Sequence, residues 1–311
     1  MASRRGLALA AGGGRGAYQA GALLALAEND IEFDAVAGSS IGALNGAFYA
    51  QGDGAVQHMR TLCDLWRSLP SAGIIRLDGA AAASAVAQVV AFGPVRATVQ
   101  SLIRRKSVAI LDPRPVAAML DAWLDYETIC QSSQECVFTV LPMIHPLIDI
   151  VTAVWREVTC LTASDLGPQE LRQGLLAACA IPLAFPAQEL QGRRSNDAAL
   201  ADPLPAGELH RRGVHDITSI FLSDDTIQNR ADFPGTTLFQ IRPSAGIGTG
   251  LRSVFDFSQE SIERLIRLGH DDTIAMLAEK KVVKQAILDL DRQGTINVTM
   301  ADALPPDSVN R

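Results

Sequence analysis

Short apolar runs alternate with amphipathic stretches along the first part of the chain. The runs at 6–11 and 33–37 are almost entirely apolar, which is typical of buried strands. The segments 16–28, 41–50 and 57–67 instead repeat apolar residues at helical spacing. This order of strand, helix, strand, turn and helix predicts parallel strands in an α/β sheet, joined by right-handed crossovers.

The same alternation resumes in the second half of the chain. A helix at 168–179 is predicted to begin at Gly167-Pro168, and a long helical pattern covers 259–290. Further strands are expected at four apolar segments, which are 136–141, 148–158, 217–222 and 237–241.

Residues 71–124 differ in composition from the parts of the chain before and after them. They are rich in Ala and Val and are interrupted by glycine and proline. We interpret them as a helical insert over one end of the sheet, in which 80–90 is a packed helix rather than a lid. With a C-terminal helical segment at 258–300, the prediction is a single domain over residues 1–311.

Composition narrows the class of protein. Apolar residues make up 48% of the chain and charged residues 20%, which argues against disorder and allows an apolar surface patch suited to a lipid. A net charge of −7 argues against a nucleic-acid partner. Five cysteines without a Cys-x-x-Cys pair suggest reduced thiols rather than a zinc site or disulfide framework.

Hydropathy also predicts the compartment. The apolar run that follows the N-terminus is too short for a signal peptide, and no run approaches the ~18 apolar residues of a membrane span. We therefore expect a cytoplasmic protein whose contact with membranes, if it has any, is interfacial and peripheral.

Two glycine-rich motifs follow the first two predicted strands. The first is Gly12-Gly13-Gly14-Arg15-Gly16, and the second is Gly38-Ser39-Ser40-Ile41-Gly42. The second fits a nucleophile elbow with Ser40 as its central serine. The N–H of Ile41, at the start of the next helix, and the N–H groups of the glycine loop suit a developing oxyanion. In this order the motifs predict an acyl-transfer site.

A serine nucleophile needs a base. None of the five histidines has a setting that singles it out, namely His58, His145, His210, His215 and His270. A carboxylate also serves when burial raises its pKa toward neutrality. Asp197, which precedes an apolar loop, is the first candidate, and Asp202 is the alternative.

Four landmarks, in order, resemble the patatin-like phospholipase family. They are the glycine loop with Tyr18, the serine motif with Asn45, the segment 180–186 and Asp197, and they span residues 6 to about 210. The resemblance implies a three-layer α/β/α fold with a mainly parallel sheet. It also implies a Ser40–Asp197 dyad without histidine, and an oxyanion loop formed by Gly12, Gly13, Gly14 and Arg15.

The resemblance further implies the substrate class. It indicates hydrolysis of fatty-acyl esters of phospholipids or lysophospholipids at a transient membrane surface, with no metal and no cofactor. Whether the chain forms a homo-oligomer stays open. One departure is Ala198, because the family typically has glycine after the base. If that position requires a positive φ, alanine costs about 1 kcal/mol and slows catalysis.

Other functions remain open at this point. The spacing Gly12-x-Gly14-x-x-Ala17 also fits a loose dinucleotide fingerprint, although the second strand ends in Gly38-Ser39 instead of an acidic residue. A His-dependent α/β-hydrolase or general carboxylesterase is a second alternative. A third is a catalytically weak protein that uses the fold for lipid binding or assembly.

Overall fold

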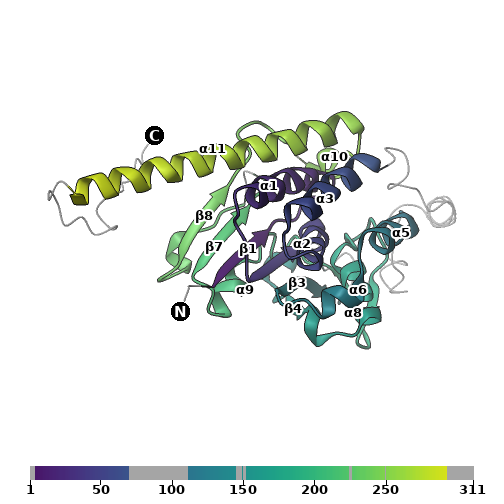
Figure 1. Ribbon diagram of the computed structural model, residues 1–311. Coiled ribbons are helices and arrows are strands. Elements are labelled where there is room, and N and C mark those ends of the chain that lie inside the picture. The colour runs from purple at the N-terminus through teal and green to yellow at the C-terminus, as the bar shows by residue number, and fades with distance from the viewer. Residues whose placement is uncertain are drawn as a thin grey trace, which may run out of the picture.

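The computed structural model describes residues 4–69, 111–144, 149, 152–223, 226–248 and 250–292. Its strands are β1 (Arg5–Leu9), β2 (Ala35–Ser39), β3 (Glu135–Pro142), β4 (Thr159–Thr162), β5 (Gln188–Leu190), β6 (Arg193–Asp197), β7 (Asp216–Ile220) and β8 (Thr237–Ile241). These eight strands form one sheet in the order β5-β6-β3-β2-β1-β7-β8, with β4 pairing beside β3. Figure 1 shows the sheet at the centre of the molecule.

The sheet is parallel in its middle and antiparallel at one edge. The pairs β1–β2, β2–β3, β1–β7 and β7–β8 are parallel. The pairs that β3 makes with β4 and β6 are antiparallel, as is β5–β6. The expected mainly parallel α/β sheet is confirmed, and the carboxyl ends of β1, β2 and β3 therefore meet at one edge.

Helices cover both faces of the sheet. On one face, Gly46 of α2 lies against Val36, so the helix approaches β2 closely. On the other face, Leu209 of α9 packs over Gly6 of β1. The α-helices are α1 (Gly16–Glu28), α2 (Ile41–Gln51), α3 (Val56–Ser68), α5 (Arg114–Trp123), α6 (Tyr126–Cys130), α8 (Pro168–Ala178), α9 (Ala206–Arg211), α10 (Gly250–Val254) and α11 (Gln259–Arg292). The described residues also include the 3₁₀ turns η1 (Gly13–Arg15), η2 (Ala153–Trp155), η3 (Ala163–Asp165) and η4 (Arg230–Asp232). The three-layer α/β/α fold is as predicted.

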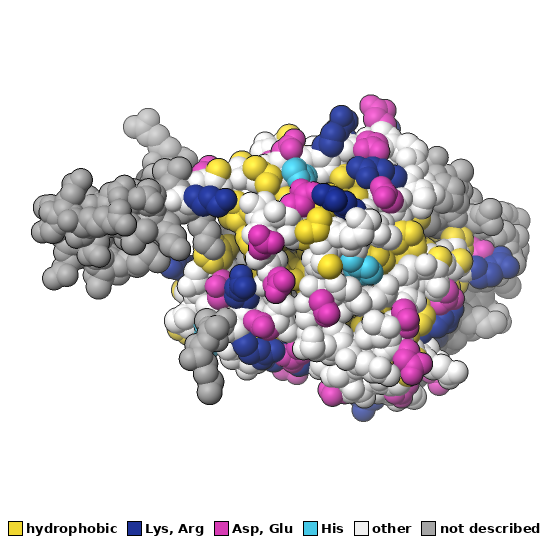
Figure 2. Space-filling model, in the orientation of Figure 1, with side chains coloured by type: hydrophobic (Ala, Val, Ile, Leu, Met, Phe, Trp, Pro, Cys, Tyr) yellow, Lys and Arg dark blue, Asp and Glu magenta, His cyan; other side chains and the backbone are white. Residues whose placement is uncertain are grey.

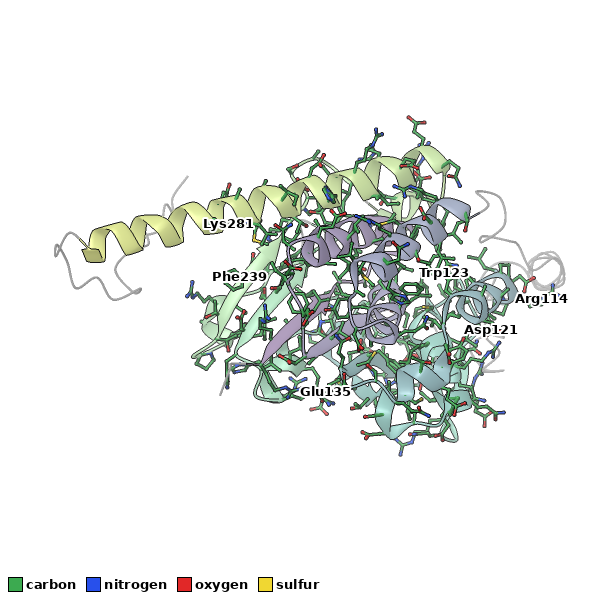
Figure 3. The ribbon with its side chains drawn as sticks, in the orientation of Figure 1. Arg114, Asp121, Trp123, Glu135, Phe239 and Lys281 are labelled. Carbon is green, nitrogen blue, oxygen red and sulfur yellow. The ribbon has the colours of Figure 1, made fainter. Side chains whose placement is uncertain are left out.

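The expected helical insert falls mostly outside the described residues. The predicted helix at 80–90 lies there entirely, whereas α5 occupies the end of the 71–124 segment. Trp123 of α5 meets Trp66 of α3 edge to face, with ring centroids 5.7 Å apart, and Figure 3 shows it pointing into the body of the protein. This contact attaches α5 to the core.

The predicted strand at 148–158 is wrong. Asp149 is helical, residues 153–155 form η2, and strand β4 begins only at Thr159. The buried carboxylate of Asp149 accepts a hydrogen bond from the backbone N–H of Ile144 at 3.2 Å and one from the guanidinium of Arg156 at 2.5 Å. These bonds connect Asp149 to both sides of the segment, and the described residues 149 and 152–158 do not form a strand.

Helix α11 packs across α1 through two reciprocal glycines. A Cβ atom on Gly21 of α1 would lie 1.9 Å from the carbonyl oxygen of Ile266, and one on Gly269 of α11 would lie 2.0 Å from that of Tyr18. The Tyr18 hydroxyl also donates to Asp272 at 2.9 Å. In Figure 1, α11 lies over α1 and continues past the sheet edge at β8.

We expect Gly21→Ala to lower the free energy of unfolding by ~2 kcal/mol, because the added methyl group overlaps the backbone of α11. Urea unfolding measures the change. The matched control is Gly207→Ala in α9, where the nearest atom to the new Cβ is Arg211 Nη1 at 3.7 Å. The control should be neutral or stabilising through helix propensity. Equal effects of the two substitutions would contradict the close α1–α11 contact.

Candidate active site

Ser40 lies on a sharp turn between β2 and α2. Its backbone has φ 53° and ψ −123°, a conformation uncommon for a residue with a side chain. A Cβ atom on Gly38 would lie 2.2 Å from the carbonyl oxygen of Gly42, and one on Gly42 would lie 2.3 Å from that of Leu9. Both glycines are therefore required by packing, which explains their spacing around the serine.

Asp197 is the hydrogen-bond partner of Ser40. The Ser40 hydroxyl donates to Asp197 Oδ2 at 2.5 Å, and the Ala199 N–H donates to Asp197 Oδ1 at 2.8 Å. Strand β3 places the two residues at the same position along the strand direction. Ser39, which precedes Ser40, pairs with Thr139, and Asp197 pairs with the next residue, Val140. Residues 157 positions apart thus meet across a single strand.

Burial determines the acidity of this carboxyl group. Asp197 is 2% exposed, and desolvation raises its pKa from 3.8 to about 7, although the hydrogen bonds from Ser40 and Ala199 oppose the shift. A carboxyl group that titrates near neutrality is suited to accept and return a proton under ordinary conditions.

The glycine loop lies against the end of α10 and the residues that follow it. Gly13 has a φ of +57°, and a Cβ atom there would lie 2.2 Å from the Val254 carbonyl oxygen. A Cβ on Gly14 would lie 2.3 Å from the carbonyl oxygen of Asp256. Arg15 donates through Nε to the Gly12 carbonyl at 3.3 Å and so closes the loop on itself. Larger residues at 13 and 14 would push the loop out of place.

A buried amide network joins the glycine loop to the nucleophile turn. The Asn45 amide on α2 donates to the Gly16 carbonyl at 3.1 Å and to the Gln19 side chain at 2.9 Å, while Gln19 donates to the Ala10 carbonyl at 2.8 Å. Trp66 completes the network by donating to Asn45 at 3.2 Å. The two helices that begin at the site are thereby held in fixed relation.

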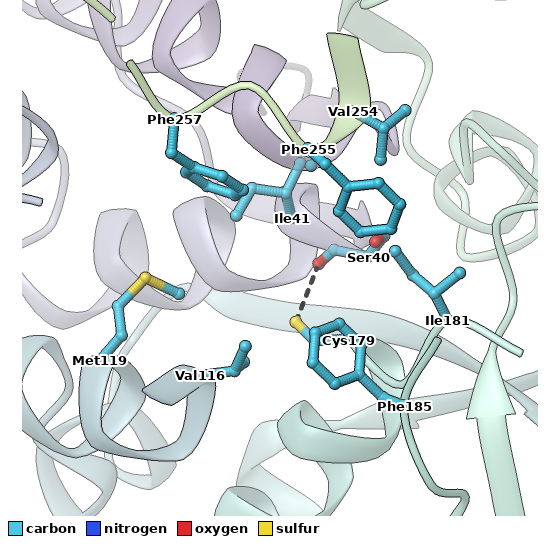
Figure 4. A pocket seen from close by; sticks show the side chains of 11 residues that line it. Ser40, Ile41, Val116, Met119, Cys179, Ile181, Phe185, Val254, Phe255 and Phe257 are labelled. Carbon is cyan, nitrogen blue, oxygen red and sulfur yellow. Dashed lines mark hydrogen bonds between the residues drawn. The ribbon is translucent and has the colours of Figure 1, made fainter. Parts of the chain in front are cut away.

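An apolar pocket lies in front of Ser40 (Figure 4). The aromatic ring of Phe257 in its wall stacks on Trp66 with centroids 6.3 Å apart. Its walls come from α5, the 179–185 segment and the 254–257 segment. The lining residues are Gly13, Ser40, Ile41, Val116, Met119, Cys179, Ile181, Phe185, Val254, Phe255 and Phe257.

The structure brings together part of the predicted oxyanion group. Gly13 and Ile41 line the pocket with Ser40, whereas Gly12, Gly14 and Arg15 are not among its lining residues. Sequence reasoning missed Cys179, whose thiol lies 3.8 Å from the Ser40 carbonyl oxygen, and the walls from α5 and 254–257. Those walls carry no local motif, so only the folded chain reveals them.

The alternative bases lie elsewhere. Asp202 donates its backbone N–H to the Ala198 carbonyl at 2.9 Å and has no recorded bond to Ser40, although burial raises its pKa. The described histidines contact other groups: His58 the Phe48 carbonyl, His210 and His215 Thr236, and His270 Glu28. His145 lies outside the described residues.

Ala198 fits its position without backbone strain. It is not among the described residues with positive φ, so the expected cost of alanine at this position does not arise. Its side chain is fully buried and clusters with Leu141 and Ala153. The departure from the family pattern therefore leaves the Asp197 carboxylate in place.

Comparison with known proteins shows the family of this chain. The model of the Patatin-like phospholipase family matches residues 7–210, and the chain belongs to that family. It is similar in structure to the crystal structure of VipD from Legionella pneumophila, with 12% identity, a TM-score of 0.43 and coverage of 89% of this chain and 67% of VipD. Within the described residues, no helix is both long and apolar enough to cross a membrane.

The raised pKa of Asp197 makes stability depend on pH. Between about pH 4 and about pH 7, the folded protein holds a proton that the unfolded chain has lost, so stability falls as pH rises through this window. Asp197→Asn removes this dependence. At pH above about 8 we expect the variant to melt about 5 °C higher than the native protein, with a smaller difference at low pH. A difference that does not change with pH in thermal melts would contradict the raised pKa.

Proposed function

We propose that this protein is a serine acyl hydrolase that cleaves fatty-acyl esters of phospholipids or lysophospholipids. The observation that carries the proposal is the Ser40–Asp197 hydrogen bond at the edge of an apolar pocket. Membership of the patatin-like phospholipase family supports the class of lipid acyl hydrolase. The pocket offers an acyl chain seven apolar side chains besides Ile41 and Cys179, which are Val116, Met119, Ile181, Phe185, Val254, Phe255 and Phe257.

In the acylation half, Asp197 accepts the Ser40 proton as Oγ attacks the ester carbonyl carbon. The carbonyl oxygen gains negative charge, which the N–H groups of Gly13 and Ile41 hold, with Gly12, Gly14 and Arg15 shaping the loop. Collapse of the tetrahedral intermediate breaks the ester C–O bond. Asp197 returns its proton to the departing alcohol, and the fatty acyl group stays on Ser40.

In the deacylation half, Asp197 accepts a proton from water as the water oxygen attacks the acyl carbon. The same donors stabilise the second oxyanion. The C–O bond to Ser40 then breaks, Ser40 regains the proton and the fatty acid leaves. We propose that the reaction takes place on the cytoplasmic side of a membrane, at its surface.

The test is fatty-acid release from mixed phospholipid vesicles and from a short p-nitrophenyl ester. We expect Ser40→Ala and Asp197→Asn each to lower turnover by about a thousandfold or more, because the nucleophile and its base act as a unit. The matched control is Asp202→Asn, which removes the half-buried carboxylate five residues after Asp197 and should keep most of the activity. Circular dichroism checks that each variant is folded.

The outcomes separate the alternatives. Activity that survives Asp197→Asn but not Asp202→Asn would move the base to Asp202. Native protein with no turnover on either substrate, yet with vesicle binding, would favour a catalytically weak lipid-binding role. Turnover of the short ester alone would indicate a general carboxylesterase.

Activity should rise with pH. Since Asp197 acts as a base and burial raises its pKa to about 7, kcat/KM is expected to increase through this region and level off above it. A pH series on the short ester, corrected for spontaneous hydrolysis, measures the profile. A plateau that already extends down to about pH 5 would show that the carboxyl group titrates much lower than burial implies.

A further inference from the structure

Four exposed apolar side chains lie on two segments that share a buried apolar cluster. Ile144, Val154 and Trp155 lie between β3 and β4 and are 59%, 61% and 79% exposed, and Leu200 follows Asp197 and is 47% exposed. We call these four residues the Trp155 patch. They are four of the six large apolar side chains that are exposed in the described part of the chain.

Buried apolar residues and a buried carboxylate lie next to the Trp155 patch. Ala153, which precedes Val154, is buried in one cluster with Leu141 and Ala198, and this cluster joins the two segments. Asp149, whose side chain is fully buried, binds the backbone N–H of Ile144 and the guanidinium of Arg156. The described residues on both segments of the patch are therefore attached to buried groups.

The same buried groups also contact the strand of the catalytic carboxylate. The Asn196 side chain donates to Asp149 at 3.4 Å, and the backbone N–H of Met143 donates to the Arg194 carbonyl at 2.7 Å. Ile144 follows the carboxyl end of β3, and Ser40 follows the carboxyl end of the parallel neighbour β2. The Trp155 patch thus lies at the edge of the sheet that bears the proposed reaction.

The charges beside the Trp155 patch are of both signs. Arg193 and Arg194 of β6 are exposed, and so are Glu157, two residues after Trp155, and Glu189, which pairs with Arg194. On the face in Figure 2, basic and acidic side chains are also interspersed without an extended basic area. Mixed charges complement a headgroup that carries both a phosphate and an ammonium group better than a purely anionic surface.

Trp155 differs from the other tryptophans in its exposure, and an exposed tryptophan favours the membrane–water interface. The other two tryptophans are buried, with Trp66 0% and Trp123 6% exposed, whereas Trp155 presents most of its ring to water. Indole rings are enriched at the headgroup level of bilayers, where the apolar ring and the polar N–H are both accommodated. An exposed tryptophan with aliphatic residues on the same segments suits shallow insertion.

We propose that the Trp155 patch docks on a phospholipid bilayer with zwitterionic headgroups, and that Trp155 enters the headgroup region. The role in presenting substrate rests on the proposed function, but docking itself does not require turnover. It would place the active-site edge of the sheet toward the lipid and reduce the distance over which an acyl chain leaves the bilayer.

The test uses the full chain and phosphatidylcholine vesicles. We expect cosedimentation with the vesicles and a shift of Trp155 emission to shorter wavelength, because the other two tryptophans are already buried. Trp155→Ser should weaken the partition coefficient about tenfold or more, since the lost ring is a large part of the inserted area. The matched control is Ile227→Ser, which removes an apolar side chain that is 85% exposed. Its neighbour Gln228 binds Gln240 of β8, at the opposite edge of the sheet.

Hydrolysis separates the two proposals. Trp155→Ser should keep its turnover of the short soluble ester while losing turnover of vesicle phospholipid. Ser40→Ala should lose hydrolysis and keep vesicle binding. If the native protein binds vesicles through Trp155 but hydrolyses neither substrate, the proposed function fails and the docking surface stands.

Three results would overturn the docking surface. One is equal vesicle binding by Trp155→Ser and the native protein, and another is an equal loss in Ile227→Ser. The third is an emission maximum already at short wavelength without vesicles that moves on dilution of the protein. That result would show that a second copy of the chain covers the patch.

Discussion

The alignment of strands β2, β3 and β6 brings the two reactive side chains of this site together. Ser40 and Asp197 come from strands on opposite sides of β3, and their side chains meet because Ser39 is level with Thr139 while Asp197 is level with Val140. Side chains alternate between the faces of a sheet, so a shift of β6 by one residue would turn the carboxylate to the opposite face. The buried Asn45 amide network fixes α2 against α1, and the glycines at 38 and 42 allow α2 to approach β1 and β2.

The site gives up some stability for its chemistry. Asp197 is a carboxyl group withdrawn from water, with one serine hydroxyl and one backbone N–H as its recorded hydrogen-bond donors. Such a group resists ionisation, and a folded protein that must ionise it is less stable than one that need not. Ser40 adds a backbone conformation that few residues with side chains adopt. Both costs are confined to one edge of a sheet whose centre is filled by apolar residues such as Leu7, Val36 and Phe138.

Sequence patterns predicted the fold where local chemistry determines structure. Three elements lie where they were expected, namely the helices at 16–28 and 168–178 and the strand at 237–241. Their hydrophobic periodicity, capping residues and turn residues all lie within or beside the segment itself. Strand β2 begins two residues later than expected, at Ala35. The errors lie where distant contacts decide. The described part of 148–158 forms no strand, and its Asp149 binds Asn196 of β6, whereas β6 is polar over Arg193–Asp197 yet forms a strand through its pairing with β3. Ser40 and Asp197 could be identified from motifs, whereas the pocket wall at 254–257 has no motif to reveal it.

The region matched to the family ends at residue 210, but the architecture does not end there. Strand β7 pairs along the whole of β1, the carbonyl oxygens of Val254 and Asp256 lie against the glycine loop, and α11 contacts α1 through Gly21 and Gly269. A fragment trimmed to the matched boundary would leave β1 as an exposed edge strand and the loop without its support. The minimal folding unit and the recognisable sequence signature are thus different stretches of this chain, and the part that carries the signature depends on the part that does not.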